Sequence, residues 1–257
     1  MLRAENLFKS FGALAVTCGV SIEVPLGRRH AIIGPNGAGK TTLFNLLAGE
    51  LRPGQGRIFI GAREVTGMGP DRRARLGLAR SFQNNNLFGE VTVRANLLLA
   101  DLAARGYGHR FWSRLDADRG AAGRAQAIAE TIGLGDVLDW PAATLSYGAQ
   151  RQLEIGLALI GEPKILLLDE PTAGMSPEET RRIFALIDGL PRTLAVLIIE
   201  HDMDLVFAHA DRITVMNCGQ VLMEGAPEQV RASSVVQDAY LGGASQDFGQ
   251  ASWHAER

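Results

Sequence analysis

The sequence contains little cysteine and no long apolar run. Only two of its 257 residues are cysteines, Cys18 and Cys218, and they lie far apart. A disulfide framework or a cysteine-rich metal site requires more cysteines at closer spacing, so we expect neither, and a reducing compartment is the default. No run of about 18 apolar residues occurs, so we expect no membrane-spanning helix. Residues 1–12 lack the apolar segment of a signal peptide.

The chain also lacks an excess of charge of either sign. Its 26 basic and 28 acidic residues leave a formal net charge of -2. Nothing in this balance indicates a nucleic acid or an acidic surface as a partner, and we expect none. With 46% hydrophobic residues, the composition is that of an ordinary globular protein that can bury a sizeable core.

The most informative stretch is a glycine-rich loop that fits the pattern G-x-x-x-x-G-K-[ST]. It follows the apolar run 29–33 and precedes 43–51, where apolar residues recur at helical spacing. Backbone N–H groups in such a loop turn toward a polyphosphate, and the helix N-terminus adds partial positive charge. Lys40 would reach the β- and γ-phosphates, and Thr41 would place its hydroxyl on Mg²⁺. The predicted nucleotide-binding residues are Gly34, Pro35, Asn36, Gly37, Ala38, Gly39, Lys40, Thr41 and Thr42.

Two carboxylates follow a second apolar run. Residues 165–168 read ILLL, and Asp169 and Glu170 come next. In a parallel sheet the carboxyl end of such a strand opens onto the ligand crevice. Asp169 would hold Mg²⁺ beside Thr41, and Glu170 would act as general base on an attacking water. The alternative is a solvated acidic pair after a core strand, which the nearby phosphate loop disfavours.

Two further strands end in polar residues. His201 follows the apolar run 194–199 and Glu200, and it could contact the γ-phosphate and the water. Gln83 follows 78–82, where it could reach Mg²⁺ or the water at the entrance to a helical region. A structural histidine and an ordinary loop glutamine are the alternatives.

A second phosphate-binding helix start is predicted at Ser146. The stretch 145–150, LSYGAQ, opens a helix with Ser146 as N-cap, and its N–H groups could bind an anion. A simple N-cap explains the pattern equally well. Because one phosphate loop already serves one triphosphate, a second such helix start suggests a triphosphate supplied by another subunit.

The order of strands and helices predicts an α/β protein interrupted by helices. Between Gln83 and Lys164 no strand is convincing, whereas amphipathic helices fit 93–104, 124–132 and 146–160. We therefore expect one domain over 1–241, with a core of 1–83 and 161–241, a helical subdomain of 84–160 and a mobile tail over 242–257. The remaining predicted strands are 2–8, 14–24, 57–60, 164–169, 194–200, 213–216 and 220–224, and the remaining helices are 70–75, 177–189, 202–210, 227–231 and 235–241.

Taken together, these motifs resemble the ATP-binding cassette (ABC) family. Its Walker A loop, Q-loop, signature, Walker B strand and switch histidine match 34–42, Gln83, 145–150, 165–170 and His201, in that order. The resemblance implies a P-loop (RecA-like) core with an N-terminal antiparallel β-subdomain and an inserted helical subdomain. It also implies a head-to-tail dimer with ATP between the Walker motifs of one subunit and Ser146 and Gly148 of the other. Phe11, which alone reads as an apolar residue in a turn, would then stack on adenine.

A narrower resemblance is to the larger ATPase of branched-chain amino acid importers. It rests on residues 80–83, 92–97, 153–155, 200–203 and 239–242. It implies ATP hydrolysis with Mg²⁺ at the cytoplasmic face of the inner membrane, a second ATPase subunit, two permeases and a periplasmic binding protein. Related importers carry urea, amides or aromatic acids, and these stay open as cargo. A non-transport ATPase acting on ribosomes or DNA is a further alternative, which the single cassette and the absence of a basic stripe disfavour.

Three residues depart from the family pattern. Tyr147 and Ala149 stand where the signature usually has glycine and glutamine, and Ser176 stands where aspartate is common. Ser146 and Gly148 are retained, so the phosphate contacts can survive. Because Lys40, Asp169, Glu170 and His201 are all present, we expect turnover to persist.

Overall fold

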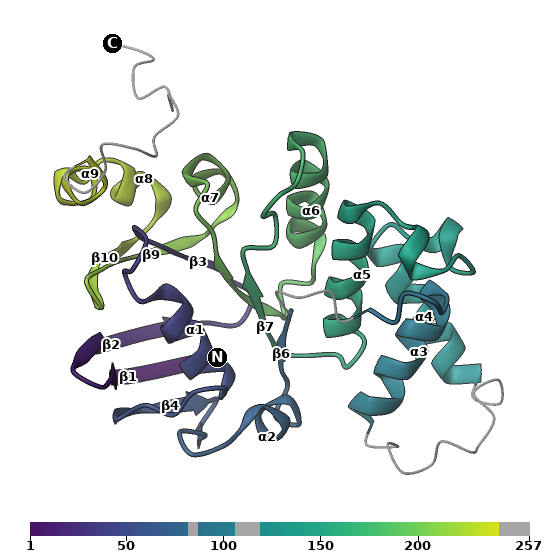
Figure 1. Cartoon of the computed structure of the whole chain (residues 1–257), viewed down its shortest axis with the longest axis horizontal. Helices are drawn as coiled ribbons and strands as arrows, with labels where there is room; N and C mark the ends of the chain where they lie inside the picture. Colours follow the sequence, from purple (N-terminus) through teal and green to yellow (C-terminus); the bar gives the residue numbers. More distant parts are fainter. Residues whose placement is uncertain (82–86, 106–118, 242–257) are drawn as a thin grey trace.

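The computed structural model describes residues 1–81, 87–105 and 119–241, and these form two β-sheets with helices around them (Figure 1). The first sheet is antiparallel in the order β2-β1-β4-β5. Its strands are β1 (Leu2–Phe11), β2 (Leu14–Val24), β4 (Gln55–Ile60) and β5 (Arg63–Glu64). It forms the predicted N-terminal β-subdomain.

The second sheet has six strands in the order β10-β9-β3-β8-β7-β6. All neighbours are parallel except β9 and β10, which form the closing hairpin. Parallel strands are short and apolar when both faces are buried, and β3, β7 and β8 are buried at every position. The strands are β3 (Arg29–Ile33), β6 (Leu78–Arg80), β7 (Ile165–Asp169), β8 (Ala195–Ile199), β9 (Arg212–Asn217) and β10 (Gln220–Gly225).

Alternate residues of β7 and β8 enter different hydrophobic cores, because successive side chains of a strand point to opposite faces. Ile165 and Leu167 pack with α1 (Lys40–Ala48) and the antiparallel sheet. Leu166 and Leu168 pack with the helical subdomain and α6 (Pro177–Gly189). A third core joins β3 and β9 to α7 (Met203–His209), α8 (Pro227–Arg231) and α9 (Ser234–Leu241).

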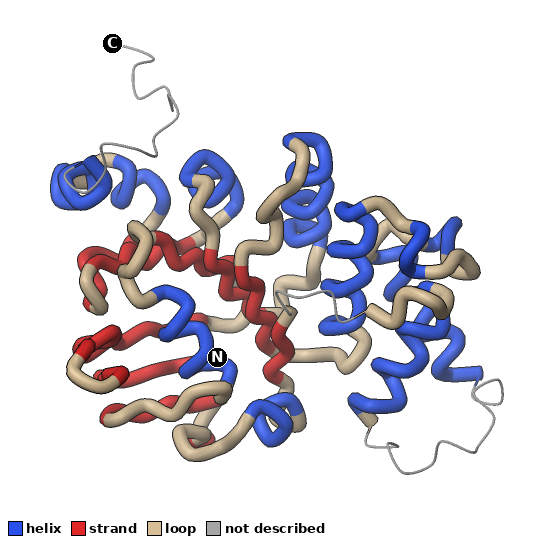
Figure 2. Tube along the Cα trace, in the orientation of Figure 1, coloured by secondary structure: helices blue, strands red, loops and turns tan. Residues whose placement is uncertain are grey.

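The helical subdomain lies beyond the β6 edge of the parallel sheet. Figure 2 shows only helix and loop in this part of the molecule. It consists of α3 (Val93–Ala104), α4 (Arg119–Thr131), α5 (Tyr147–Leu159) and two 3₁₀ turns, Gly135–Val137 and Ala142–Thr144. The short α2 (Pro70–Ala74) precedes β6.

The fold class is therefore as predicted, and most elements lie within a few residues of their predicted ends. The main differences are that β1 extends to Phe11, that α4 begins at Arg119 rather than 124, and that β5 and the two 3₁₀ turns are not among the predicted elements. Within the described ranges no helix is long and apolar enough to cross a membrane. The predicted mobile tail, 242–257, lies outside the residues that the structure describes.

Candidate nucleotide site

The carboxyl ends of three neighbouring strands bring most of the predicted site residues to one edge of the sheet. The strands β3, β8 and β7 are adjacent, with Ile32 and Asp169 both paired to Ile199. The phosphate loop follows β3, Glu170 follows β7, and His201 follows β8 by two residues. These segments are far apart in the sequence, so parallel pairing is what assembles them.

The phosphate loop requires glycine where it touches neighbouring backbone. A Cβ atom on Gly34 would lie 2.2 Å from the carbonyl oxygen of Met216, and one on Gly39 would lie 2.6 Å from that of Val16. Gly34, Gly37 and Gly39 also have positive φ, at 154°, 80° and 96°. The loop thus packs directly against the backbone of β9 and β2. This packing holds the loop in the curved form that can surround a phosphate.

Lys40 begins α1 and its ammonium group turns back over the loop. Its Nζ donates to the carbonyls of Gly34 at 2.6 Å and Pro35 at 3.1 Å. Burial lowers the pKa of Lys40, and the charges of Glu170 and Asp169 oppose that shift. The first N–H groups of α1 have no partner inside the helix, so with Lys40 they form a positive site for phosphate.

Asp169 is 2% exposed, and its Oδ2 makes no hydrogen bond. The nearest cationic partner of that oxygen is Arg80 on β6, whose Nη2 is 3.7 Å away. Burial raises the pKa of Asp169, while Arg80 opposes this. A buried carboxylate oxygen without a hydrogen bond beside the phosphate loop fits a site for a hard cation such as Mg²⁺.

The residues present fit Mg²⁺ only together with a phosphate group. Among the described residues, no cluster of three or more His, Cys, Asp or Glu could hold a metal by itself. Thr41 and Asp169 are predicted to supply one oxygen ligand each, and Mg²⁺ commonly takes few protein ligands and several phosphate or water oxygens. Gln83, the third predicted ligand, lies outside the described residues.

Glu170 adopts a backbone conformation that is unusual for its residue type. Its φ is 44°, and its N–H donates to the carbonyl of Ile199 at 2.9 Å. Such a left-handed residue is strained unless its surroundings hold it. Glu170 therefore differs in backbone conformation from Asp169, which is still part of β7, although the two are adjacent in sequence.

His201 is exposed and rests on a buried carboxylate. Glu200 accepts from the His201 N–H at 3.1 Å and from Thr172 through both the N–H and the hydroxyl, at 3.2 and 2.6 Å. Glu200 therefore ties the end of β8 to the segment after Glu170. The His201 ring stays available at the surface, 66% exposed.

The signature segment, 145–150, forms the start of α5. Ser146 caps α5 and accepts from the Ala149 N–H at 3.3 Å. None of the hydrogen bonds found in the described ranges joins Ser146 or Gly148 to the phosphate loop. The prediction that these residues serve another subunit's nucleotide therefore remains a prediction.

The departures from the family pattern have structural partners within this chain. Tyr147 donates its hydroxyl to the Ala173 carbonyl at 3.2 Å, and Gly148 N–H donates to Glu179 at 3.1 Å. Ser176 caps α6 and forms a capping box with Glu179. Hydrogen bonds from Ser176 lower the pKa of Glu179. Tyr147 thus joins the signature segment to the loop before α6, and Glu179, which Ser176 holds, joins it to the first turn of α6.

Phe11 lies at the end of β1, in the hairpin that touches the phosphate loop through Val16. Its side chain is 49% exposed, and the Lys9 Nζ is 5.3 Å from the ring centroid. An exposed aromatic ring in this hairpin is able to stack on a base.

Three charged residues at this edge were not singled out from the sequence. They are Arg80, Arg151 and Glu200, all of which contact the ends of β7 or β8. Glu200 could have been found, because it interrupts an apolar strand directly before His201. The two arginines carried no signal, since arginine on a helix or strand is usually exposed.

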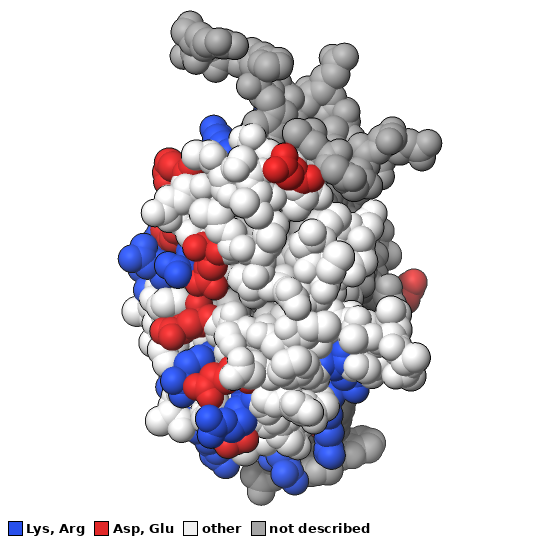
Figure 3. Space-filling model, turned by 90° about the vertical axis from the view of Figure 1, so that its left-hand side faces the viewer, with Lys and Arg blue, Asp and Glu red and all other residues white. Residues whose placement is uncertain are grey.

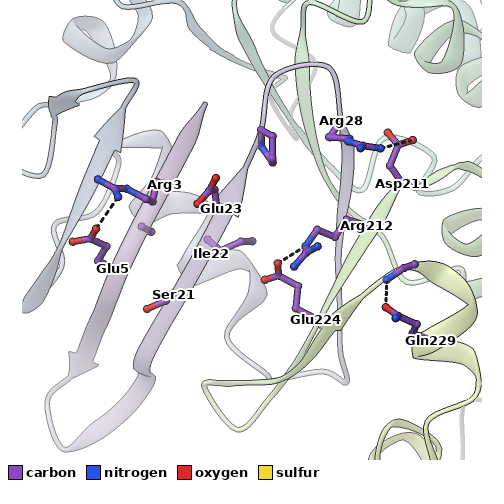
Figure 4. Close-up of a pocket in the computed structure, with 13 residues that line it drawn as sticks. Arg3, Glu5, Ser21, Ile22, Glu23, Arg28, Asp211, Arg212, Glu224 and Gln229 are labelled. Atoms are coloured by element: carbon purple, nitrogen blue, oxygen red, sulfur yellow. Dashed lines mark hydrogen bonds and ion pairs between the residues drawn. The ribbon is translucent and has the colours of Figure 1, made fainter.

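A separate cavity of about 740 Å³ lies on the other side of the molecule, between the antiparallel sheet and the β9–β10 hairpin (Figure 4). Six of the seven charged residues that line it pair with each other: Arg3 with Glu5 at 3.3 Å, Arg28 with Asp211 at 3.9 Å, and Arg212 with Glu224; the seventh, Glu23, is acidic. The face in Figure 3 likewise carries both signs along one edge beside a broad uncharged area. These ion pairs leave the cavity without the unopposed positive charge that a phosphate requires.

The fold and the strand-end site define a P-loop nucleotide-binding protein. The sequence profile described as "ABC transporter" matches residues 18–173. The high-affinity branched-chain amino acid transport ATP-binding proteins BraF of Pseudomonas aeruginosa and LivG of Escherichia coli are each 40% identical over 251 residues, covering 94% of this chain and 98% of theirs. The chain therefore belongs to the ABC transporter family, as one of its nucleotide-binding ATPase cassettes.

Solved structures support the same assignment. An ATP-binding cassette of an ABC transporter in its ADP conformation superposes with a TM-score of 0.85 at 33% identity, covering 94% of this chain and 98% of that one. A nucleotide-free cassette superposes with a TM-score of 0.82, also at 33% identity, covering 93% and 98%.

Proposed function

We propose that this chain hydrolyses ATP to energise an importer of branched-chain amino acids. The observation that carries the chemistry is the meeting of Lys40, Asp169 and Glu170 at one sheet edge. The cargo rests on the relatives BraF and LivG, which match nearly the whole chain and are named for branched-chain amino acid transport.

In this mechanism the loop from Gly34 to Thr42 and Lys40 hold the triphosphate, and Phe11 stacks on adenine. Thr41, Asp169 and Gln83 would hold Mg²⁺, which when bound neutralises part of the phosphate charge. Glu170 accepts a proton from the attacking water, and His201 contacts the water and the γ-phosphate. Lys40 stabilises the charge that develops on the transferred phosphoryl group.

Ser146 and Gly148 would complete the site of a second ATPase subunit, identical or related. Because the loop bearing Glu170 is tied to Tyr147 through Ala173, dimer closure would act on both halves of the site. Two permeases, a periplasmic binding protein and a peripheral position at the cytoplasmic face of the inner membrane complete the proposed system.

The permease would dock on the helical side. Phe88 is 62% exposed there, while its backbone N–H and carbonyl are both held by the buried side chain of Asn96, at 3.0 Å each. A rigid backbone presenting an exposed aromatic ring suits a protein interface. We also expect Asn84–Asn86 and Phe111–Trp112 to contact the permease, but these residues, like Gln83, lie outside the part of the chain that the structure describes.

Glu170→Gln tests the catalytic assignment. We expect ATP binding to persist and hydrolysis to fall by at least about 100-fold, because the general base is lost. The variant should form an ATP-dependent dimer in size-exclusion chromatography with light scattering. Glu178→Gln, on the exposed face of α6, is the matched control and should retain activity. Near-normal hydrolysis by Glu170→Gln would contradict the assignment.

The cargo requires a different measurement, because the cassette does not touch it. We expect the solute-binding protein that works with this ATPase to bind leucine, isoleucine or valine in isothermal calorimetry. If the binding protein bound urea, a short amide or an aromatic acid instead, the proposed cargo would be wrong, while the ATPase assignment would stand.

A further inference from the structure

Arg151 on α5 reaches out of the helical subdomain to the end of β7. Its side chain is buried, with the residue only 6% exposed. Its Nη2 donates to the carbonyls of Asp169 and Glu170, both at 3.2 Å, and its Nε donates to the carbonyl of Pro171 at 3.2 Å. One guanidinium group therefore holds three consecutive carbonyls of the segment that carries the predicted general base.

The held segment is the one with the strained backbone. Glu170 has a φ of 44°, a conformation that a residue with a side chain keeps only when its surroundings enforce it. Two backbone bonds also hold it, from Glu170 N–H to Ile199 and from Ala173 N–H to the Glu170 carbonyl. Arg151 is the side chain that fixes the carbonyls on either side of Glu170. A rigid fork of donors suits this task better than a single ammonium group.

Glu154 fixes Arg151 in turn. Its Oε2 accepts from Arg151 Nη1 at 2.6 Å, and the residue is 6% exposed. Burial raises the pKa of Glu154, and Arg151 opposes that shift. Glu154 also lines a cavity of about 570 Å³ that lies between α2, β6, α3 and α5, and its Oε1 makes no hydrogen bond. The pair thus spans from this cavity to the catalytic segment.

We propose that Arg151 and Glu154 form a positioning pair that aims Glu170 at the attacking water. This inference rests on the proposed function, since it assigns the pair a role through Glu170. Arg151 touches no reacting atom; it sets the direction of a strained peptide segment from the helical subdomain. Without the pair, Glu170 samples other directions. The phosphate loop and Lys40 keep their geometry, because none of the hydrogen bonds and ion pairs found in the described ranges joins Arg151 to residues 34–42.

The test compares steady-state ATP hydrolysis by the full-length protein and by Arg151→Met, Arg151→Lys and Glu154→Gln. We expect kcat to fall by about 10- to 100-fold in Arg151→Met, with KM for ATP within about threefold of the unaltered protein. Arg151→Lys and Glu154→Gln should lose less, since each keeps part of the hydrogen bonding. If Arg151→Met does not fold, Arg151→Lys and Glu154→Gln replace it in the test. They should also show a fall in kcat with KM for ATP nearly unchanged.

Asp101→Asn is the matched control. Asp101 is also a buried carboxylate of the helical subdomain, paired with Arg105 at 2.9 Å and Arg124 at 2.5 Å, and its contacts lie away from β7. The proposal would be overturned if Asp101→Asn lost as much kcat as Arg151→Met. It would also be overturned if Arg151→Met raised KM for ATP and left kcat unchanged. Unchanged turnover in a folded Arg151→Met would overturn it as well.

Hydrogen exchange separates this proposal from the proposed function, because it needs no activity. Peptides covering 165–175 should exchange faster in Arg151→Met, while peptides covering 34–48 should not change. If the unaltered protein had no ATPase activity, the proposed function would be wrong. The exchange measurement would still show whether Arg151 holds the backbone of residues 165–175. Unchanged exchange over 165–175 in Arg151→Met would overturn the proposal that the pair positions Glu170.

Discussion

At the scale of single residues, Gly34 has room for no side chain at all. A Cβ there would meet the Met216 carbonyl oxygen at 2.2 Å, and this backbone atom belongs to β9, which is paired on both sides, so it cannot move without disturbing the sheet. We expect Gly34→Ala to destabilise the protein by about 2–4 kcal/mol, from overpacking and backbone strain together. Nucleotide affinity, measured with a fluorescent ADP analogue, should fall because the loop must shift.

Gly12→Ala is the control for the strain component. Gly12 also has positive φ, 60°, but a Cβ there would meet no atom within 4 Å. Its cost should therefore be about 1–2 kcal/mol, the price of the backbone conformation alone. If urea unfolding gave the two variants equal stability, steric contact with Met216 would not be the reason for glycine at 34.

His30 lies in the central strand of the parallel sheet and is fully buried. Its Nε2 is 2.7 Å from the Thr214 hydroxyl, and burial lowers the pKa of His30 to about 4 from an ordinary value of 6.5. Between about pH 4 and 6.5, His30 is therefore protonated in the unfolded chain and neutral in the folded chain. Stability is fully present above about pH 6.5 and is lost as the pH falls toward 4, by about 1.4 kcal/mol per pH unit.

His30→Gln should flatten this dependence, since glutamine can still hydrogen-bond Thr214 and does not titrate. The measurement is the free energy of unfolding in urea at several pH values between 4.5 and 7, taken as about the range in which the two states differ in proton binding. A slope that is the same in both proteins would rule out His30 as its source.

At the scale of elements, buried arginines close the C-terminal ends of two helices. Arg73 donates to Leu46 and Leu47 of α1, both at 2.7 Å, and Arg29 donates to Ile187 and Leu190 at the end of α6. A cation at this end satisfies carbonyls that have no partner within the helix and complements the helix dipole. Because α1 starts at the phosphate loop, Arg73 anchors the far end of the element that carries Lys40.

Arg73→Met should cost about 3–5 kcal/mol of unfolding free energy, because it leaves buried carbonyls without donors. Arg73 also donates to Met68, Val65 and Thr66, so several groups lose a partner at once. Arg72→Met changes the neighbouring, exposed side chain of α2 and should cost less than about 0.5 kcal/mol. Similar denaturation midpoints for the two variants would contradict the anchoring role.

The elements that could be predicted from sequence are those with their own local signals. The apolar runs of β7 and β8 predicted buried strands, the predicted N-cap Ser146 precedes α5, and α6 begins at the predicted residue, Pro177. The phosphate loop, Asp169 and Glu170 were predictable because their chemistry requires fixed residue types at fixed spacing. The roles of these residues as ligands and catalyst remain predictions.

The elements that differ from the sequence prediction depend on contacts between segments that are distant in the sequence. Gly120 and Gly123 disfavour helix, yet α4 already includes them, because Arg124 is held by Asp101 of α3. β5 is only two residues long and exists through pairing with Phe59 and Ile60. Arg80 and Arg151 were missed for the same reason: their burial follows from tertiary packing that a single sequence does not display.

At the scale of the whole molecule, the antiparallel sheet and the helical subdomain share the central strands of the parallel sheet. Leu167 faces the core with α1 and the antiparallel sheet, and its neighbour Leu168 faces the core with α5 and α6. Since both side chains come from β7, loss of either core removes support from the other. We therefore expect the described part of the chain to unfold as one unit.

Leu167→Ala and Leu168→Ala test this cooperativity. Each should lower the free energy of unfolding by about 2–5 kcal/mol, from lost burial and a residual cavity. In native-state hydrogen exchange, both variants should lower the protection of β1 and of α5 together. Leu14→Ala, at a largely exposed position, is the control and should change neither. Two independent units would give a different pattern: Leu167→Ala would loosen only β1, and Leu168→Ala would loosen only α5. That pattern would divide the chain into separate domains and would also remove the rigid path by which Arg151 on α5 is proposed to position Glu170.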